Sequence, residues 1–114
     1  MPGVLALEAD LFRALAHPSR LRLLELLGEG KLSVGELQAL SGGESGTTSQ
    51  HLSALRRQGL IAGHREGTSV IYRIKDARTR RMLRLAREII RERLAEGQAL
   101  LDELGHEPPN ERRR

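Results

Sequence analysis

The chain has 114 residues, 39% of them hydrophobic and 30% charged, which predicts one small ordered domain rather than a disordered segment. It contains no cysteine, which excludes disulfides, thiolate metal sites and cysteine nucleophiles, and its apolar runs are too short to cross a bilayer. The formal net charge is +4, but residues 1–44 hold four basic and six acidic residues whereas residues 45–74 hold four basic and one acidic, so a surface for nucleic acid would begin partway along the chain.

The first part of the sequence predicts three helices. Apolar residues at helical spacing indicate the first helix over residues 5–15. Pro18 then suits the first turn of a second helix, over residues 18–27, which two glycines terminate. Ser33 and Glu36 have the spacing of a capping box, which predicts a short third helix that runs to about residue 40.

The rest of the sequence predicts a polar helix, a hairpin and a long helix. The polar helix covers residues 45–58 and ends at a glycine. Alternating residues indicate two strands, over residues 60–65 and 69–74, with a tight turn between them. A seam of apolar residues in steps of three and four predicts the last helix over residues 77–104, and we expect residues 105–114 to be a disordered tail.

A short helix, a tight turn, a polar helix and a hairpin in this order predict a winged helix-turn-helix. The fold class is therefore mostly α with a small β-hairpin, in one domain over residues 1–104. A helix fits the major groove of DNA, where short polar side chains reach base edges, and Arg65 on the hairpin can contact the backbone or the minor groove. The alternative from pattern alone is a helical domain with a surface hairpin and no role with nucleic acid. The residues predicted to contact DNA are Ser45, Thr47, Thr48, Ser49, Gln50, His51, Ser53, Arg56, Arg65 and Thr68.

Three segments of the sequence carry a more specific signal. They read ALAHPSRLRLL over residues 14–24, SQHLSALRRQGLI over residues 49–61 and REGTSVIYRI over residues 65–74. In this order and at these separations they resemble the ArsR/SmtB family of bacterial transcriptional regulators, over roughly residues 7–104. The resemblance implies a homodimer that binds a roughly palindromic operator in double-stranded DNA. It also implies a repressor that an inducer, most often a metal ion, releases.

The first and last helices carry more apolar residues than one small domain can cover. We expect them to pack across a twofold axis, so that two recognition helices lie about one DNA turn, roughly 34–36 Å, apart. The predicted dimer interface consists of Leu7, Leu11, Leu83, Ile90, Leu94, Gly97 and Leu101.

The metal sites that the resemblance implies are largely lost. The helix before the turn has no cysteine, and on the last helix Asp76 and Glu92 occupy carboxylate positions while Arg78 and Ile89 replace the imidazoles. Two carboxylates alone bind a transition metal poorly. No metal cofactor is therefore evident, and a metal ion stays an alternative by analogy with the family, with Asp76 and Glu92 as weak candidate ligands. Asp76 would instead cap the last helix, and Glu92 would pair with an arginine of the partner subunit, most simply Arg78.

Other functions are weaker interpretations of the same sequence. Ser49 and His51 are two residues apart on a helix and point to different sides, which predicts no catalytic pair and no enzyme. His17, His64 and His106 have no spacing typical of a metal site. Because the sensor ligands are missing, the rival hypothesis is a protein-interaction module controlled by an effector protein. The start of the sequence lacks a secretion signal, so we expect a cytoplasmic protein that does not contact a membrane.

Overall fold

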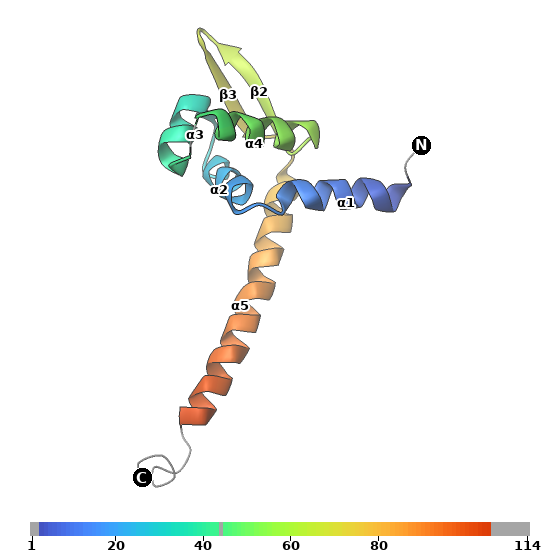
Figure 1. Cartoon of the computed structure of the whole chain (residues 1–114), viewed down its shortest axis with the longest axis vertical. Helices are drawn as coiled ribbons and strands as arrows, with labels where there is room; N and C mark the ends of the chain where they lie inside the picture. The colour runs from blue at the N-terminus through green and yellow to red at the C-terminus, as the bar shows by residue number, and fades with distance from the viewer. Residues whose placement is uncertain (1–2, 44, 106–114) are drawn as a thin grey trace. The chain divides into compact units, whose positions relative to one another are not determined.

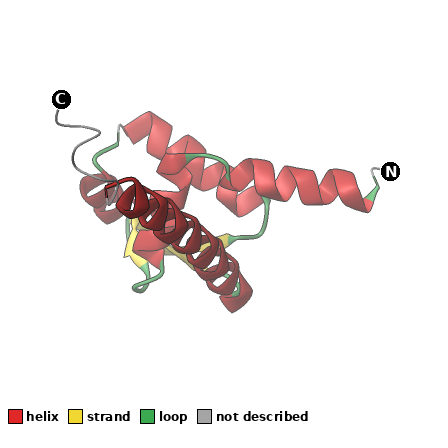
Figure 2. Cartoon of the chain, turned by 90° about the horizontal axis from the view of Figure 1, so that it is seen from below, coloured by secondary structure: helices red, strands yellow, loops and turns green. Residues whose placement is uncertain are grey.

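The computed structural model describes residues 3–43 and 45–105, which are mostly helical with one small antiparallel sheet (Figure 1). Figure 2 shows the same helices and strands from below. Contacts divide the described chain after Thr79 into two units, the second of which consists of the last helix from Arg80 onward. No helix within residues 3–43 or 45–105 has both the length and the apolar character needed to cross a membrane. The elements are α1 (Val4–Leu15), α2 (Pro18–Leu27), β1 (Leu32–Ser33), α3 (Val34–Ser41), α4 (Ser45–Arg57), β2 (Ile61–Glu66), β3 (Ser69–Ile74) and α5 (Ala77–Gly105).

The core of the first unit lies between α2, α3, α4 and the sheet. Leu27 on α2 and Leu55 on α4 are fully buried, and Ile61 at the start of β2 packs into the same core. Helix α1 contributes only Ala14 and Leu15, at its C-terminal end. Burying one leucine side chain stabilises a fold by about 1.5–3 kcal/mol. The buried leucines of α4 therefore determine which of its faces remains in solvent.

Helix α3 begins at the capping box that the sequence predicts. Ser33 Oγ accepts a hydrogen bond from the backbone N–H of Glu36 over 3.1 Å, and Glu36 Oε1 accepts one from the N–H of Ser33 over 2.9 Å. These bonds with the backbone and side chain of Ser33 lower the pKa of the Glu36 carboxyl group. Strand β1 immediately precedes the helix and pairs with β3, with Leu32 opposite Tyr72. The start of α3 is thus tied to the sheet.

Strands β2 and β3 form a hairpin that extends beyond the helices of the first unit (Figure 1). The register pairs Glu66 with Ser69, which leaves a two-residue turn that begins at Gly67. Gly67 has φ of +63°, a left-handed conformation that such turns require. Farther down the hairpin a Cβ at Gly63 would lie 2.9 Å from Cε1 of Tyr72, so only glycine leaves room for that ring.

The predicted fold class is confirmed, and the element ends differ from the predicted ones by at most one residue. The turn of the hairpin is shorter than predicted because Glu66 still pairs in β2. Strand β1 was not predicted, since two residues are too few to show an alternating pattern. The last helix includes Gly105, which was predicted to belong to the tail, and residues 106–114 lie outside the described residues. The single domain over residues 1–104 stays a prediction.

Candidate nucleic-acid interface

Helix α4 presents a polar face to solvent because its apolar face is buried. Leu52 and Leu55 are 1% and 0% exposed. Thr47, Ser49 and Gln50, in the first turns of the helix, are exposed. Side chains of this kind can hydrogen-bond to the edges of bases when their helix lies in the major groove. Of the other residues predicted on this helix, Ser53 is half-buried and Arg56 is exposed, and the side chain of Ser45 lies outside the described residues.

Thr48 belongs to the buried face of α4. It is only 3% exposed, and it precedes Leu52 by four residues, so both side chains lie on the same side of the helix. A Cβ at Gly43 would come within 3.0 Å of its Oγ1, which shows how closely the preceding turn packs against this residue. This burial argues against a contact between the Thr48 side chain and DNA.

His51 lies one turn farther into α4 than Thr47, and it is half-buried. Its Nδ1 accepts a hydrogen bond of 3.0 Å from Nε of Arg20 on α2. The centroid of its ring is 5.7 Å from that of His17. Burial, together with the positive charge of Arg20 and the presence of His17, lowers the pKa of the His51 imidazole below its usual value of 6.5. The lowered pKa favours the neutral imidazole at pH 7, and the bond from Arg20 to Nδ1 assigns its proton to Nε2.

Beside α4 lies a groove of about 480 Å³, which we call the Arg20–Arg57 groove. Its lining residues all carry hydrogen-bonding side chains and include two arginines, neither of which was predicted as a site residue. No local signal marks Arg20, because it is 31 residues away from His51 in the sequence. The groove is lined by Arg20, Ser49, Gln50, Ser53 and Arg57.

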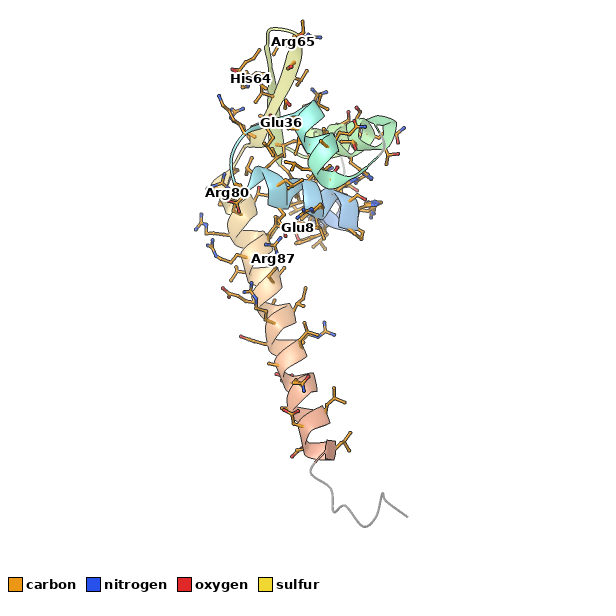
Figure 3. All side chains as sticks on the ribbon, turned by 90° about the vertical axis from the view of Figure 1, so that its left-hand side faces the viewer. Glu8, Glu36, His64, Arg65, Arg80 and Arg87 are labelled. Atoms are coloured by element: carbon orange, nitrogen blue, oxygen red, sulfur yellow. The ribbon has the colours of Figure 1, made fainter. Side chains whose placement is uncertain are left out.

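The hairpin contributes the second predicted contact surface. Arg65 and Thr68 are exposed, and Figure 3 shows Arg65 near the outer end of the hairpin. Next to it, Nε2 of His64 is 3.4 Å from Oε2 of Glu66, an ion pair only when the imidazole is protonated. Arg65 has no ion-pair partner in the part of the chain that the structure describes, so its charge is available to a phosphate.

Helix α5 carries the predicted apolar seam on an exposed surface. Ile90, Leu94 and Leu101 are 52%, 68% and 62% exposed, and Gly97 between them is half-buried. On α1, Leu7 is likewise exposed. The charged residues of α5 include Arg80 and Arg87, which Figure 3 labels. Apolar residues in steps of three and four on an exposed helix indicate a surface that a second protein segment covers.

Asp76 caps α5, as the sequence predicts. Its Oδ1 accepts a 2.9 Å hydrogen bond from the backbone N–H of Arg78, and its Oδ2 is 2.6 Å from Nη2 of the same residue. This pairing with Asp76 raises the pKa of Arg78. Glu92 has no ion pair within residues 3–43 and 45–105, and its pairing with Arg78 of the partner subunit stays a prediction. Over the same residues there is no cluster of three or more side chains with the chemistry of a metal site.

Comparison with known proteins shows which family the chain belongs to. Residues 15–64 match the helix-turn-helix domain family. An HTH-type transcriptional regulator of Mycobacterium tuberculosis, Rv0081, is 42% identical over 99 residues, which cover 86% of this chain and 87% of the relative. Its crystal structure superposes with a TM-score of 0.78 at 40% identity and covers 84% of this chain and 97% of the other.

Two further structures are similar over much of the chain. One is the solution structure of a homodimeric winged helix-turn-helix DNA-binding domain from Mycobacterium bovis, described as a possible ArsR-family transcriptional regulator. Its TM-score is 0.76 at 33% identity, over 82% of this chain and 86% of that one. The other is the transcriptional repressor BigR from Xylella fastidiosa, with a TM-score of 0.66 at 36% identity, over 71% of this chain and 83% of that one.

Proposed function

Because the chain belongs to the ArsR family of winged helix-turn-helix transcriptional regulators, we propose that it binds a roughly palindromic DNA operator as a homodimer and represses transcription. The observation that carries the proposal is the exposed polar face of α4, held by buried leucines beside a projecting basic hairpin. With α4 in the major groove, Gln50 faces the base edges and Arg65 faces the backbone. The DNA that such a regulator binds is cytoplasmic, and we place the protein there.

Gln50→Ala tests the contact with bases. A glutamine can pair bidentately with adenine, so its loss should reduce the preference for one base pair of the operator by about 1–3 kcal/mol. The measurement is a fluorescence-anisotropy titration of duplexes from the chain's own promoter region, with every base pair substituted in turn. Arg65→Ala serves as the contrast, since it should weaken binding to all duplexes alike. If Gln50→Ala changed the affinity for all sequences equally, α4 would not read bases through this residue.

The dimer in this proposal forms through the exposed seam of α5 and the apolar residues of α1. A homodimeric relative supports it, as does the number of exposed large apolar residues on both helices. Twofold symmetry then places the two α4 helices in successive major grooves on one side of the duplex. The rival hypothesis, a protein-interaction module without DNA, is not favoured by these relatives, which are named as regulators or repressors.

The residues at the start of α5 indicate whether a metal ion could act as the inducer. Asp76 is already engaged with Arg78, and a cation there would have to displace a guanidinium group. We therefore expect calorimetric titration with zinc, nickel and cobalt to give no stoichiometric site tighter than micromolar. A tight site that disappears in Asp76→Ala or Glu92→Ala would instead make this protein a carboxylate-based metal sensor. The proposal assigns the protein no catalysed reaction.

A further inference from the structure

Arg20 connects three helices of the first unit. From α2 its Nε donates to Nδ1 of His51 on α4 over 3.0 Å, and its Nη1 donates to the carbonyl oxygen of Ala14, at the end of α1, over 3.2 Å. The side chain is half-buried. Two bonds in fixed directions hold the plane of the guanidinium group, which a lysine at this position could not reproduce.

The guanidinium group keeps donors that these two bonds do not use. It has five N–H groups, so about three remain, and within residues 3–43 and 45–105 they have no partner. The group lines the Arg20–Arg57 groove together with two hydroxyl groups and an amide, and no carboxylate lines this groove. In the adjoining groove Asp10 is the one carboxylate, and it already pairs with Arg13 at 2.5 Å. Two cationic groups with free donors and no acidic partner favour a bound anion.

We propose that the Arg20–Arg57 groove binds a phosphate of the DNA backbone and that His51 is the positioning residue that orients Arg20 toward it. The inference rests on the proposed function, because the groove borders the same exposed face of α4 that would enter the major groove. It adds a phosphate contact on α2 and at the end of α4, separate from the hairpin. Phosphate contacts of this kind fix the register of a recognition helix without reading sequence.

The chemistry of His51 suits this positioning role. Only an unprotonated Nδ1 can accept from Nε of Arg20, and the groups that face the imidazole, His17 and Arg20, are cationic or neutral. Burial and these two neighbours lower the pKa of His51, which favours the neutral imidazole at pH 7 and with it the acceptor for Arg20.

The first test measures how affinity for duplex DNA depends on salt. Each phosphate contact contributes about 0.9 to the slope of log K against log salt. Because a homodimer presents this groove twice, Arg20→Ala and Arg57→Ala should each lower that slope by about two, equally on the promoter duplex and on a scrambled duplex. Lys31→Ala, which removes the same charge from an exposed position that does not line the groove, should leave the slope unchanged. Thermal unfolding of each variant verifies that the fold persists.

The second test addresses His51 and needs no DNA. Nitrogen-15 NMR of the free wild-type protein should show His51 protonated on Nε2 only, and Arg20→Lys should give a mixture of both tautomers. His51→Asn, whose Oδ1 can accept from Arg20, should keep the wild-type salt slope, whereas His51→Ala should lower it, and the loss should not add to that of Arg20→Ala. Unchanged slopes in the Arg20 and Arg57 variants of a wild type that binds DNA would overturn this inference alone. A wild-type protein that binds no duplex would overturn the proposed function and this inference with it.

Discussion

Leu55→Ala is expected to lower the free energy of unfolding by about 2–5 kcal/mol, the range for truncating a leucine in a packed core. Leu55 is 0% exposed and lies on the buried face of α4. Its loss leaves a cavity between α4 and the helices beneath it, and the partly relaxed core cannot fill that space. Because the same side chain anchors the helix that would enter DNA, affinity for the operator should fall as well. Urea denaturation followed by circular dichroism measures the change.

Leu40→Ala is the matched control. It is the same substitution on α3, but Leu40 is 54% exposed, so we expect a loss of at most about 0.5 kcal/mol. Both variants are compared at one protein concentration, because dimerisation makes apparent stability depend on concentration. Equal losses in the two variants would mean that α4 is not held in the way the buried leucines imply.

Most of the fold is predictable from the sequence because its signals are local. Ser33 and Glu36 form the capping box that their spacing indicates, and Gly67 adopts the positive φ expected of a tight hairpin turn. Helix ends and strand pairs of this kind depend on residues only two to four positions apart. The described elements consequently differ from the predicted ones only at their ends and in strand β1, which was not predicted.

The candidate site is less predictable because it depends on packing. Thr48 was predicted to contact DNA from its polarity, yet its spacing of four and seven residues from Leu52 and Leu55 places it on the buried face. That spacing is visible in the sequence and argues against the predicted contact. The bond between Arg20 and His51 was not visible, because it joins two helices across 31 residues of sequence. Contacts of that range depend on how α2 and α4 cross, which no local pattern encodes.

The contact between Asp76 and Arg78 bears on the predicted ion pair between Glu92 and Arg78 of the partner subunit. The cap that the sequence predicts is present, but Arg78 folds back onto the same carboxylate. An ion pair between Glu92 and Arg78 of the partner subunit would therefore have to compete with a contact that already exists in each chain. At an exposed position solvent screens both charges, so such exchanges change the free energy of the dimer little. The stability of the dimer must then come from the apolar seam.

Leu94→Glu is expected to convert the dimer to a monomer. It should also lower the affinity for the operator by about 10²–10⁴-fold, because the two recognition helices that bind the two half-sites would no longer be linked. Leu94 is 68% exposed in the single chain and lies between Ile90 and Leu101 in the seam of α5, where the partner would enclose a new carboxylate in apolar surroundings. Ala95→Glu adds the same charge one position outside the seam and should leave the dimer intact. Light scattering at micromolar concentration gives the mass, and anisotropy gives the affinity. If Leu94→Glu kept the mass and affinity of Ala95→Glu, the subunits would meet through another surface, and the seam of α5 would need a different partner to cover it.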